Sequence, residues 1–157
     1  MKFVEPSADL NWIAISQSPL LMADLIAWAT RPEYGAVVTF SGTVRENSGT
    51  LTGVTRLEYE TDVKLAEGRM TEVAAEARLL WPTLGAIAIH HRTGRVELGD
   101  CAVIIVVSSP HRQEAFEGAQ FCIDTVKDCV PMWKREFWEG GSDWSDDARP
   151  ILKVRER

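Results

Sequence analysis

The sequence predicts an α+β fold in which a largely antiparallel sheet is combined with helices. Three helix-like segments alternate with short strand-like runs in the order β-α-β-β-α-β-β-α-β. Residues 101–107 are apolar on both faces, which is typical of a central strand in a sheet. The chain has no internal repeat, and we interpret residues 1–144 as one domain that is followed by a tail at residues 145–157.

The composition is that of a globular protein with an acidic surface. Of the 157 residues, 45% are apolar, and 23 acidic residues outnumber 17 basic ones, which gives a net charge of −6. This balance argues against nucleic acid as the main partner, although a few local cations could still hold a small anion. No apolar run reaches membrane-spanning length, so we expect no membrane association. The three cysteines lack CxxC spacing, and we expect no disulfide, no zinc site and a reducing cytoplasm.

The first part of the chain predicts a helix and a strand. Ser18 and Pro19 suit an N-cap and a first helical position, so we expect the helix to begin there. Its apolar stripe consists of Leu21, Leu25 and Trp28. Residues 35–45 alternate apolar and polar side chains as in a strand with one buried face. Thr43 and Arg45 are therefore expected to point away from the core.

The middle of the chain predicts a second helix between strands. Asp62 can cap this helix, and Pro82 ends it. The apolar residues recur at spacings of three and four and are Ala66, Met70, Val73, Ala77 and Leu80. Strands are expected at residues 54–60, 85–92 and 101–107, a mobile loop at 46–53, and a turn region at 93–100.

A third helix is predicted to begin with Ser109 as its cap and Pro110 as its first residue. Its apolar stripe contains Ala115, Ala119, Cys122 and Val126, widened by Phe116 and Ile123. Pro131 ends the helix, and residues 132–138 resume as a strand. We expect Trp133 to anchor that strand in the core.

Two lysines flank the end of the third helix. Lys127 falls in the last helical turn and Lys134 in the following strand, so a reversal near Pro131 could bring them together. Two ammonium groups in a partly desolvated pocket repel each other, which suits one of them to exchange protons while the other holds an anion. The alternative is that Lys127 only complements the helix dipole and Lys134 is simply exposed.

Three further cations could join such a pocket. His111 and Arg112 lie in the first helical turn, where cations oppose the dipole unless an anion binds among them. The alternative is that Glu114 and Glu117 neutralise the arginine. Arg45, at a strand end, is either a solvated residue or a third cation of the same pocket.

Other chemistry is not favoured by the sequence. His90 and His91 are adjacent on a strand and face opposite sides, so they cannot share a metal ion. No GxSxG, P-loop or GxGxxG motif is present. Cys129 is better explained as a small buried residue than as a nucleophile. We expect neither a metal ion nor a cofactor.

Four segments together resemble a known family. They are "GAVVTFSGTVR", "HHRTGRVELGD", "SSPHRQEAFEGAQFCIDTVK" and "PMWKRE", and the match runs from about residue 35 to residue 136, which is most of the chain. In order and spacing they resemble the large, catalytic subunit of molybdopterin synthase. The resemblance implies an α/β hammerhead fold with an additional antiparallel β-sheet.

The resemblance also implies an activity and partners. Members convert cyclic pyranopterin monophosphate into molybdopterin by installing two dithiolene sulfurs. The sulfur arrives as a C-terminal thiocarboxylate on a small ubiquitin-like sulfur-carrier subunit that ends in Gly-Gly. Two large subunits form a central homodimer with one carrier at each end, which makes a heterotetramer.

The resemblance carries site roles onto particular residues. The implied substrate contacts are Thr43, Val44, Arg45, His111, Arg112, Lys127, Lys134, Arg135 and Glu136. Lys127 and Lys134 match the two essential lysines, with Lys127 nearer the carrier tail. His111 and Arg112 match an anion-binding pair that reaches the pocket from the neighbouring subunit.

Alternatives remain open at this point. The chain could be a non-catalytic module that binds a pterin, a phosphate or a ubiquitin-like protein, or a lysine enzyme that forms a Schiff base. Retention of both lysines favours the sulfur-transferring enzyme over a phosphate binder. The residues Cys129-Val130, the loop at 46–53 and the tail depart from the family pattern. The basic tail residues Lys153, Arg155 and Arg157 either dock an acidic partner or belong to a disordered end.

Overall fold

The computed structural model describes residues 5–49, 51–145 and 150–157 of the chain. Its elements are β1 Asn11–Ser16, α1 Met22–Ala29, β2 Ala36–Thr43, β3 Val54–Glu60, α2 Val63–Leu80, β4 Ile87–Arg92, β5 Gly94–Glu97, β6 Cys101–Ser109, α3 Arg112–Cys129, β7 Trp133–Trp138, β8 Gly141–Trp144 and the 3-10 turn η1 Val154–Glu156. The strands form two four-stranded sheets, ordered β1-β4-β6-β2 and β5-β3-β7-β8. Within the described ranges, no helix has the length and apolarity needed to cross a membrane.

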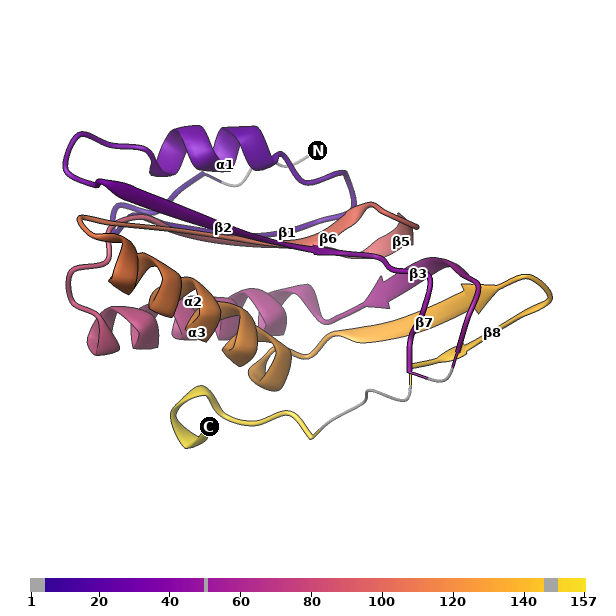
Figure 1. The fold of residues 1–157 in the computed structure, drawn as a ribbon. Helices are drawn as coiled ribbons and strands as arrows, with labels where there is room; N and C mark the ends of the chain where they lie inside the picture. Colours follow the sequence, from indigo (N-terminus) through magenta and orange to yellow (C-terminus); the bar gives the residue numbers. More distant parts are fainter. Residues whose placement is uncertain (1–4, 50, 146–149) are drawn as a thin grey trace.

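The first sheet is covered by helices on both faces, with α1 on one side and α2 and α3 on the other (Figure 1). Strand β6 lies between β4 and β2 and is antiparallel to both, whereas β1 is parallel to β4. The prediction of a central strand at residues 101–107 is thereby confirmed. The single buried face expected for residues 35–45 is wrong, because Val37 packs beneath α1 while Val38 and Phe40 pack toward α2 and α3.

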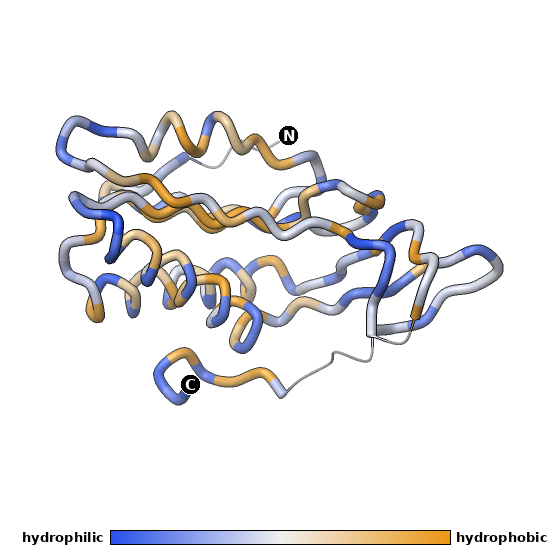
Figure 2. The backbone as a smooth tube through the Cα atoms, in the orientation of Figure 1, coloured by the Kyte–Doolittle hydropathy of each residue, from blue (hydrophilic) through white to orange (hydrophobic). Residues whose placement is uncertain are grey.

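The larger core lies between the first sheet and the helices α2 and α3. It includes Ala66, Met70, Val73 and Ala77 of α2, Ala119, Cys122, Ile123 and Val126 of α3, and Ile87, Ile89 and Ile105 of the sheet. Figure 2 shows the hydrophobic residues concentrated along the strands of this sheet. Two residues predicted in the apolar stripes of α2 and α3 do not join this core, since Leu80 is 52% and Phe116 62% exposed. Leu80 ends its helix, and Phe116 lies about 100° around the helix from the buried Ala115. Leu21, predicted in the stripe of the first helix, is 54% exposed and precedes α1, so that prediction is wrong too.

The second sheet continues from the end of the first and carries its own small core of Val54, Leu57 and Val96, joined by Val44 (Figure 1). Strand β3 pairs antiparallel with β5 and β7, and β7 pairs antiparallel with β8. Residues 93–100, expected as a turn region, contain the strand β5, and β8 was not predicted. Both strands are only four residues long, which leaves too few positions for a periodic pattern.

Two predicted helix starts are wrong and one is confirmed. Helix α1 begins at Met22 rather than at Pro19, because Ser18 instead donates its backbone N–H to the Ser16 hydroxyl in a tight turn. Helix α3 begins at Arg112, because Ser109 is still paired with β2 as the last residue of β6. Asp62 caps α2 as predicted, and its side chain accepts a hydrogen bond from the backbone N–H of Leu65 at 3.0 Å.

The described part of the tail packs on the domain. The Val154 side chain is 5% exposed and joins the larger core, and the backbone N–H of Leu152 donates to the Asp128 carbonyl at 2.9 Å. Arg157 Nε donates to Asp128 Oδ2 at 2.7 Å. The expected disordered end is therefore wrong for residues 150–157. Residues 146–149 of the predicted tail lie outside the described residues.

Candidate functional site

A cavity of about 510 Å³ opens where the end of α3 meets the second sheet. Its wall is made by Arg45, Tyr59, His91, Val103, Ile123, Val126, Lys127, Asp128, Val130, Met132, Trp133, Lys134, Trp144, Ser145 and Ile151. Part of the apolar wall comes from α3 and β6 and the rest from the connection to β7, from Trp133 and Trp144 and from Ile151, while the cations come from three separate segments. A cavity of this size suits a small organic ligand.

The two lysines that flank the helix end both line this cavity. Helix α3 ends at Cys129, and Pro131 stands in the connection to β7, so the chain turns sharply between Lys127 and Lys134. Lys127 belongs to the last turn of α3, where the exposed helix carbonyls favour a cation. Arg45, two residues after the end of β2, is the third cation of the lining. The structure thus brings together Arg45, Lys127 and Lys134.

Strand β7 alternates between a sheltered and an exposed face. Glu136 is 6% exposed on the sheltered face, whereas Arg135 is exposed on the other. Trp133, expected in the core, is 49% exposed, because the core of the second sheet lies on the face that carries Glu136. The Ser48 hydroxyl donates to Glu136 Oε1, which ties Ser48 to β7. Arg135 lies over the Trp144 ring at 5.8 Å from its centroid.

Thr43 and Val44, the other two substrate contacts implied for this segment, do not line the cavity. Thr43 is exposed, and Val44 is 3% exposed within the small core of the second sheet. The strand register shifts between Gly42 and Thr43. Of the segment at residues 43–45, Arg45 alone lines the cavity.

His111 and Arg112 do not reach this cavity within one chain. His111 is the N-cap of α3 and Arg112 its first residue, and the helix has 18 residues, or a length of about 27 Å. They stand at the N-terminal end of α3, whereas Lys127 stands in its last turn, so most of the helix lies between them. Among the described residues no ion pair joins Arg112 to Glu114 or Glu117, and Glu117 Oε2 instead accepts from Trp81 Nε1 at 2.9 Å.

Two cavity residues, His91 and Tyr59, were missed by the sequence analysis. Burial raises the pKa of Tyr59 to about 12, with a further contribution from the Glu136 carboxylate, so the phenol stays protonated. Burial, together with the charge of the nearby Lys127, lowers the pKa of His91 to about 4. The predicted opposite orientation of His90 and His91 is confirmed, since their rings contact Trp12 and Tyr59 respectively.

The cysteines take no part in this constellation. All three are free, and Cys122 and Cys129 are fully buried. Burial raises the pKa of the Cys122 thiol to about 12 and also raises that of Cys129. Neither thiol is therefore poised as a nucleophile. Within the described residues, no cluster of three or more His, Cys, Asp or Glu side chains could hold a metal ion.

The fold and the cavity together define an α+β protein with a pocket lined by three cations. The sequence model of the MoaE protein family matches residues 15–129, and the chain belongs to this family. It is 39% identical over 137 residues to the molybdopterin synthase catalytic subunit of Halalkalibacterium halodurans, covering 85% of both chains. It is 40% identical over 134 residues to that of Bacillus subtilis, covering 85% of this chain and 83% of the relative.

Solved structures agree with this assignment. Molybdopterin synthase from Staphylococcus aureus superposes with a TM-score of 0.78 at 36% identity, covering 83% of this chain and 94% of that one. The complex of subunits 1 and 2 of molybdopterin-converting factor from Helicobacter pylori gives a TM-score of 0.72 at 19% identity, covering 90% and 94%. The second likeness shows the fold alone. The fold class expected from the resemblance is confirmed.

Proposed function

We propose that the cavity transfers sulfur from the thiocarboxylate of a small carrier subunit to cyclic pyranopterin monophosphate, forming the dithiolene of molybdopterin. As a member of its family the chain is the catalytic subunit of molybdopterin synthesis, a sulfurtransferase. The observation that carries the proposal is the meeting of Lys127, Lys134 and Arg45 in one cavity of an otherwise acidic protein. A local cationic pocket suits a substrate with a cyclic phosphate.

The reaction requires a thiocarboxylate held against the pterin side chain, followed by proton transfers as sulfur adds and oxygen leaves. We assign Lys127 to orienting and polarising the thiocarboxylate, because it lies at the cavity end of α3. Lys134 then exchanges protons or neutralises the charge that develops on the departing oxygen. Arg45 holds the phosphate, and its side chain needs no proton exchange for that role.

The partners follow from the same proposal. A carrier tail ending in Gly-Gly has no side chains at its end, so it can thread beside the lysines into a narrow cavity. Trp133, Trp144 and Ile151 line the cavity and are 49%, 47% and 46% exposed, which offers an apolar rim to the carrier. The three free cysteines are consistent with the cytoplasm as the place of action.

The decisive experiment mixes the purified chain with a thiocarboxylated carrier and the cyclic pyranopterin and measures dithiolene product. Lys127→Ala and Lys134→Ala should each lower the rate by about 100-fold or more while the fold is retained. Lys64→Ala, on the exposed side of α2, is the matched control and should keep the rate. A carrier with a plain carboxylate should give no product. Undiminished activity of either lysine variant would reject its assigned role.

The same assay separates an enzyme from a binding module. A module would bind the pterin and the carrier yet give no dithiolene product with the thiocarboxylated carrier. In a module, Lys134→Ala would change only the affinity for the ligand, whereas in the enzyme it would lower the rate of product formation.

Sharing of the pocket between two subunits gives a second test. We place His111 and Arg112 in the pocket of the neighbouring copy, because they lie about 23 Å from Lys127 along α3. Lys127→Ala and Arg112→Ala should then be inactive alone but active when mixed. Half of the dimers are mixed, and each mixed dimer keeps one intact pocket, so we expect about a quarter of the wild-type rate. If verified mixed dimers recover no activity, Lys127 and Arg112 of one chain serve the pocket of that same chain.

A further inference from the structure

We propose that His91 is a positioning residue of this reaction, whose ring nitrogen Nε2 accepts a hydrogen bond from the Lys127 ammonium and orients it in the cavity. The inference rests on the proposed function. It adds to the site a neutral residue beside the three cations Arg45, Lys127 and Lys134. Both side chains line the same cavity, His91 from strand β4 and Lys127 from helix α3.

Strand β4 directs His91 toward the cavity. Ile87, Ile89 and His91 alternate onto the face covered by α2 and α3, and the first two belong to the larger core. His91 is the position at which this stripe leaves the core and reaches the cavity. Its neighbour across the ladder, Val103 of β6, also lines the cavity. His90 points to the opposite face, where its ring packs on Trp12 at 5.2 Å between centroids.

The contacts of His91 fix which nitrogen carries the proton. Its Nδ1 lies 2.7 Å from the carbonyl oxygen of Arg92, and a carbonyl can only accept, so Nδ1 holds the hydrogen. The ring is neutral at neutral pH, because burial and the Lys127 charge lower its pKa to about 4. In a neutral ring with hydrogen on Nδ1, Nε2 is left as an acceptor.

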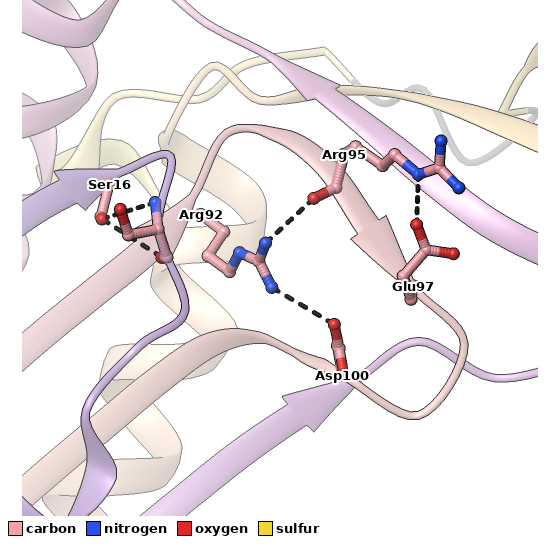
Figure 3. Close-up of polar contacts among 6 residues, drawn as sticks. Ser16, Arg92, Arg95, Glu97 and Asp100 are labelled. Carbon is pink, nitrogen blue, oxygen red and sulfur yellow. Dashed lines mark hydrogen bonds and ion pairs between the residues drawn. The ribbon is translucent and has the colours of Figure 1, made fainter.

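The residue whose carbonyl holds the ring is itself anchored, and Figure 3 shows the contacts of its side chain to Arg95 and Asp100. Arg92 Nη2 donates to the Arg95 carbonyl at 3.0 Å, and Arg92 Nη1 lies 3.5 Å from Asp100 Oδ2. The next residue, Thr93, donates its backbone N–H to the Ser16 carbonyl at 2.9 Å. The backbone around the Arg92 carbonyl is therefore anchored on both β1 and the β5–β6 connection.

A second contact restrains the plane of the imidazole. The Tyr59 ring meets it edge to face, with centroids 5.1 Å apart and planes at 75°. Together with the Arg92 carbonyl, this contact leaves the ring little freedom to rotate.

A neutral acceptor suits this place better than a carboxylate would. The lysine side chain is long and flexible, and its ammonium has three donors that need directing. A carboxylate would direct the ammonium but would also cancel its charge. The neutral His91 orients the cation and leaves its charge for the anionic thiocarboxylate and phosphate.

Two substitutions test the roles of the two ring nitrogens of His91 separately. A Gln amide lies near the position of Nε2, whereas an Asn amide lies near that of Nδ1. His91→Gln therefore keeps an acceptor toward the cavity, and His91→Asn keeps the hydrogen bond to the Arg92 carbonyl. We expect His91→Asn to lower kcat by about 10- to 100-fold with KM within about threefold, and His91→Gln to stay within about fivefold of the wild-type kcat.

The outcomes distinguish the possible roles. Greater loss in His91→Gln than in His91→Asn would mean that the residue only supports the backbone, and the proposal would be overturned. Equal losses or wild-type rates in both variants would overturn it too. His90→Asn, on the opposite face, is the control and should keep the wild-type kcat. If the wild-type chain itself makes no product, the proposed function fails rather than the assignment of His91 alone.

A measurement on the unmodified protein keeps the proposal testable if the variants do not fold. Nitrogen-15 NMR of the histidine side chains at neutral pH should show His91 with hydrogen on Nδ1 and none on Nε2. A ring protonated on Nε2, or a doubly protonated ring, would overturn the proposal.

Discussion

Acid should destabilise this fold well before its carboxylates are protonated, because two buried histidines must gain protons. Burial lowers the pKa of His90 and of His91 from 6.5 to about 4. The folded state therefore binds fewer protons than the unfolded state between these values. Their contribution to stability is fully present above pH 6.5 and is lost as the pH falls toward 4.

The size of the effect follows from the two pKa values. Between pH 7 and pH 5, a group that shifts from 6.5 unfolded to about 4 folded loses about 2 kcal/mol of stabilisation. His90 and His91 face opposite sides of β4 and share no partner ring, so their contributions should add to about 4 kcal/mol.

Urea unfolding at pH 7 and pH 5, at one fixed protein concentration, measures this difference. His90→Asn removes one of the titrating rings, so the loss between the two pH values should fall by about 2 kcal/mol relative to the wild type. An equal loss in wild type and variant would refute the reasoning, because it would show that His90 is not kept neutral by burial.

Two further predictions concern the helices. Gly68→Ala on the open surface of α2 should stabilise the fold by about 1 kcal/mol, whereas Gly118→Ala in α3 should destabilise it, because a Cβ there would lie 2.9 Å from the Leu84 side chain. Thermal unfolding of the two variants checks the opposite signs, and a rise in Tm for Gly118→Ala would contradict the packing argument. Asp62→Ala should lower the free energy of unfolding by about 1 kcal/mol by removing the cap of α2, and Asp62→Asn, which keeps the acceptor, should lower it by much less. Equal losses for the two variants in urea unfolding would show that the hydrogen bond of the cap is not the cause.

Features set by local periodicity could be predicted from the sequence. The apolar stripes of α2 and α3, and the central position of β6, follow from patterns of side chains that are a few residues apart. The cap of α2 joins Asp62 to Leu65, only three residues further along the chain. The proximity of Lys127 and Lys134 also follows from a local cause, the reversal at Pro131. In each case the residues that decide the structure are close in the chain.

Features set by competition or distant pairing could not be predicted. Ser109 and Pro110 have the residue types of a helix start, but pairing of Ser109 with Ala36 in β2 extends the strand instead. Trp133 is a residue type common in cores, but in β7 it lies on the exposed face, and Lys134 and Glu136 occupy the sheltered face instead. The cavity residues Tyr59 and His91 come from two different sheets and meet only in the folded chain.

Helix α3 supports the proposal that a second subunit completes the pocket. Lys127 stands at its C-terminal end, where the helix dipole favours a cation, but Arg112 stands at its N-terminal end, where the dipole opposes one. Among the described residues, neither Glu114 nor Glu117 forms an ion pair with Arg112 to offset that cost. An anionic ligand would offset it, and under the proposed function that ligand is the phosphate of a substrate bound in the neighbouring copy. One helix would then serve two pockets, and the rigidity of its 18 residues would fix the distance between them.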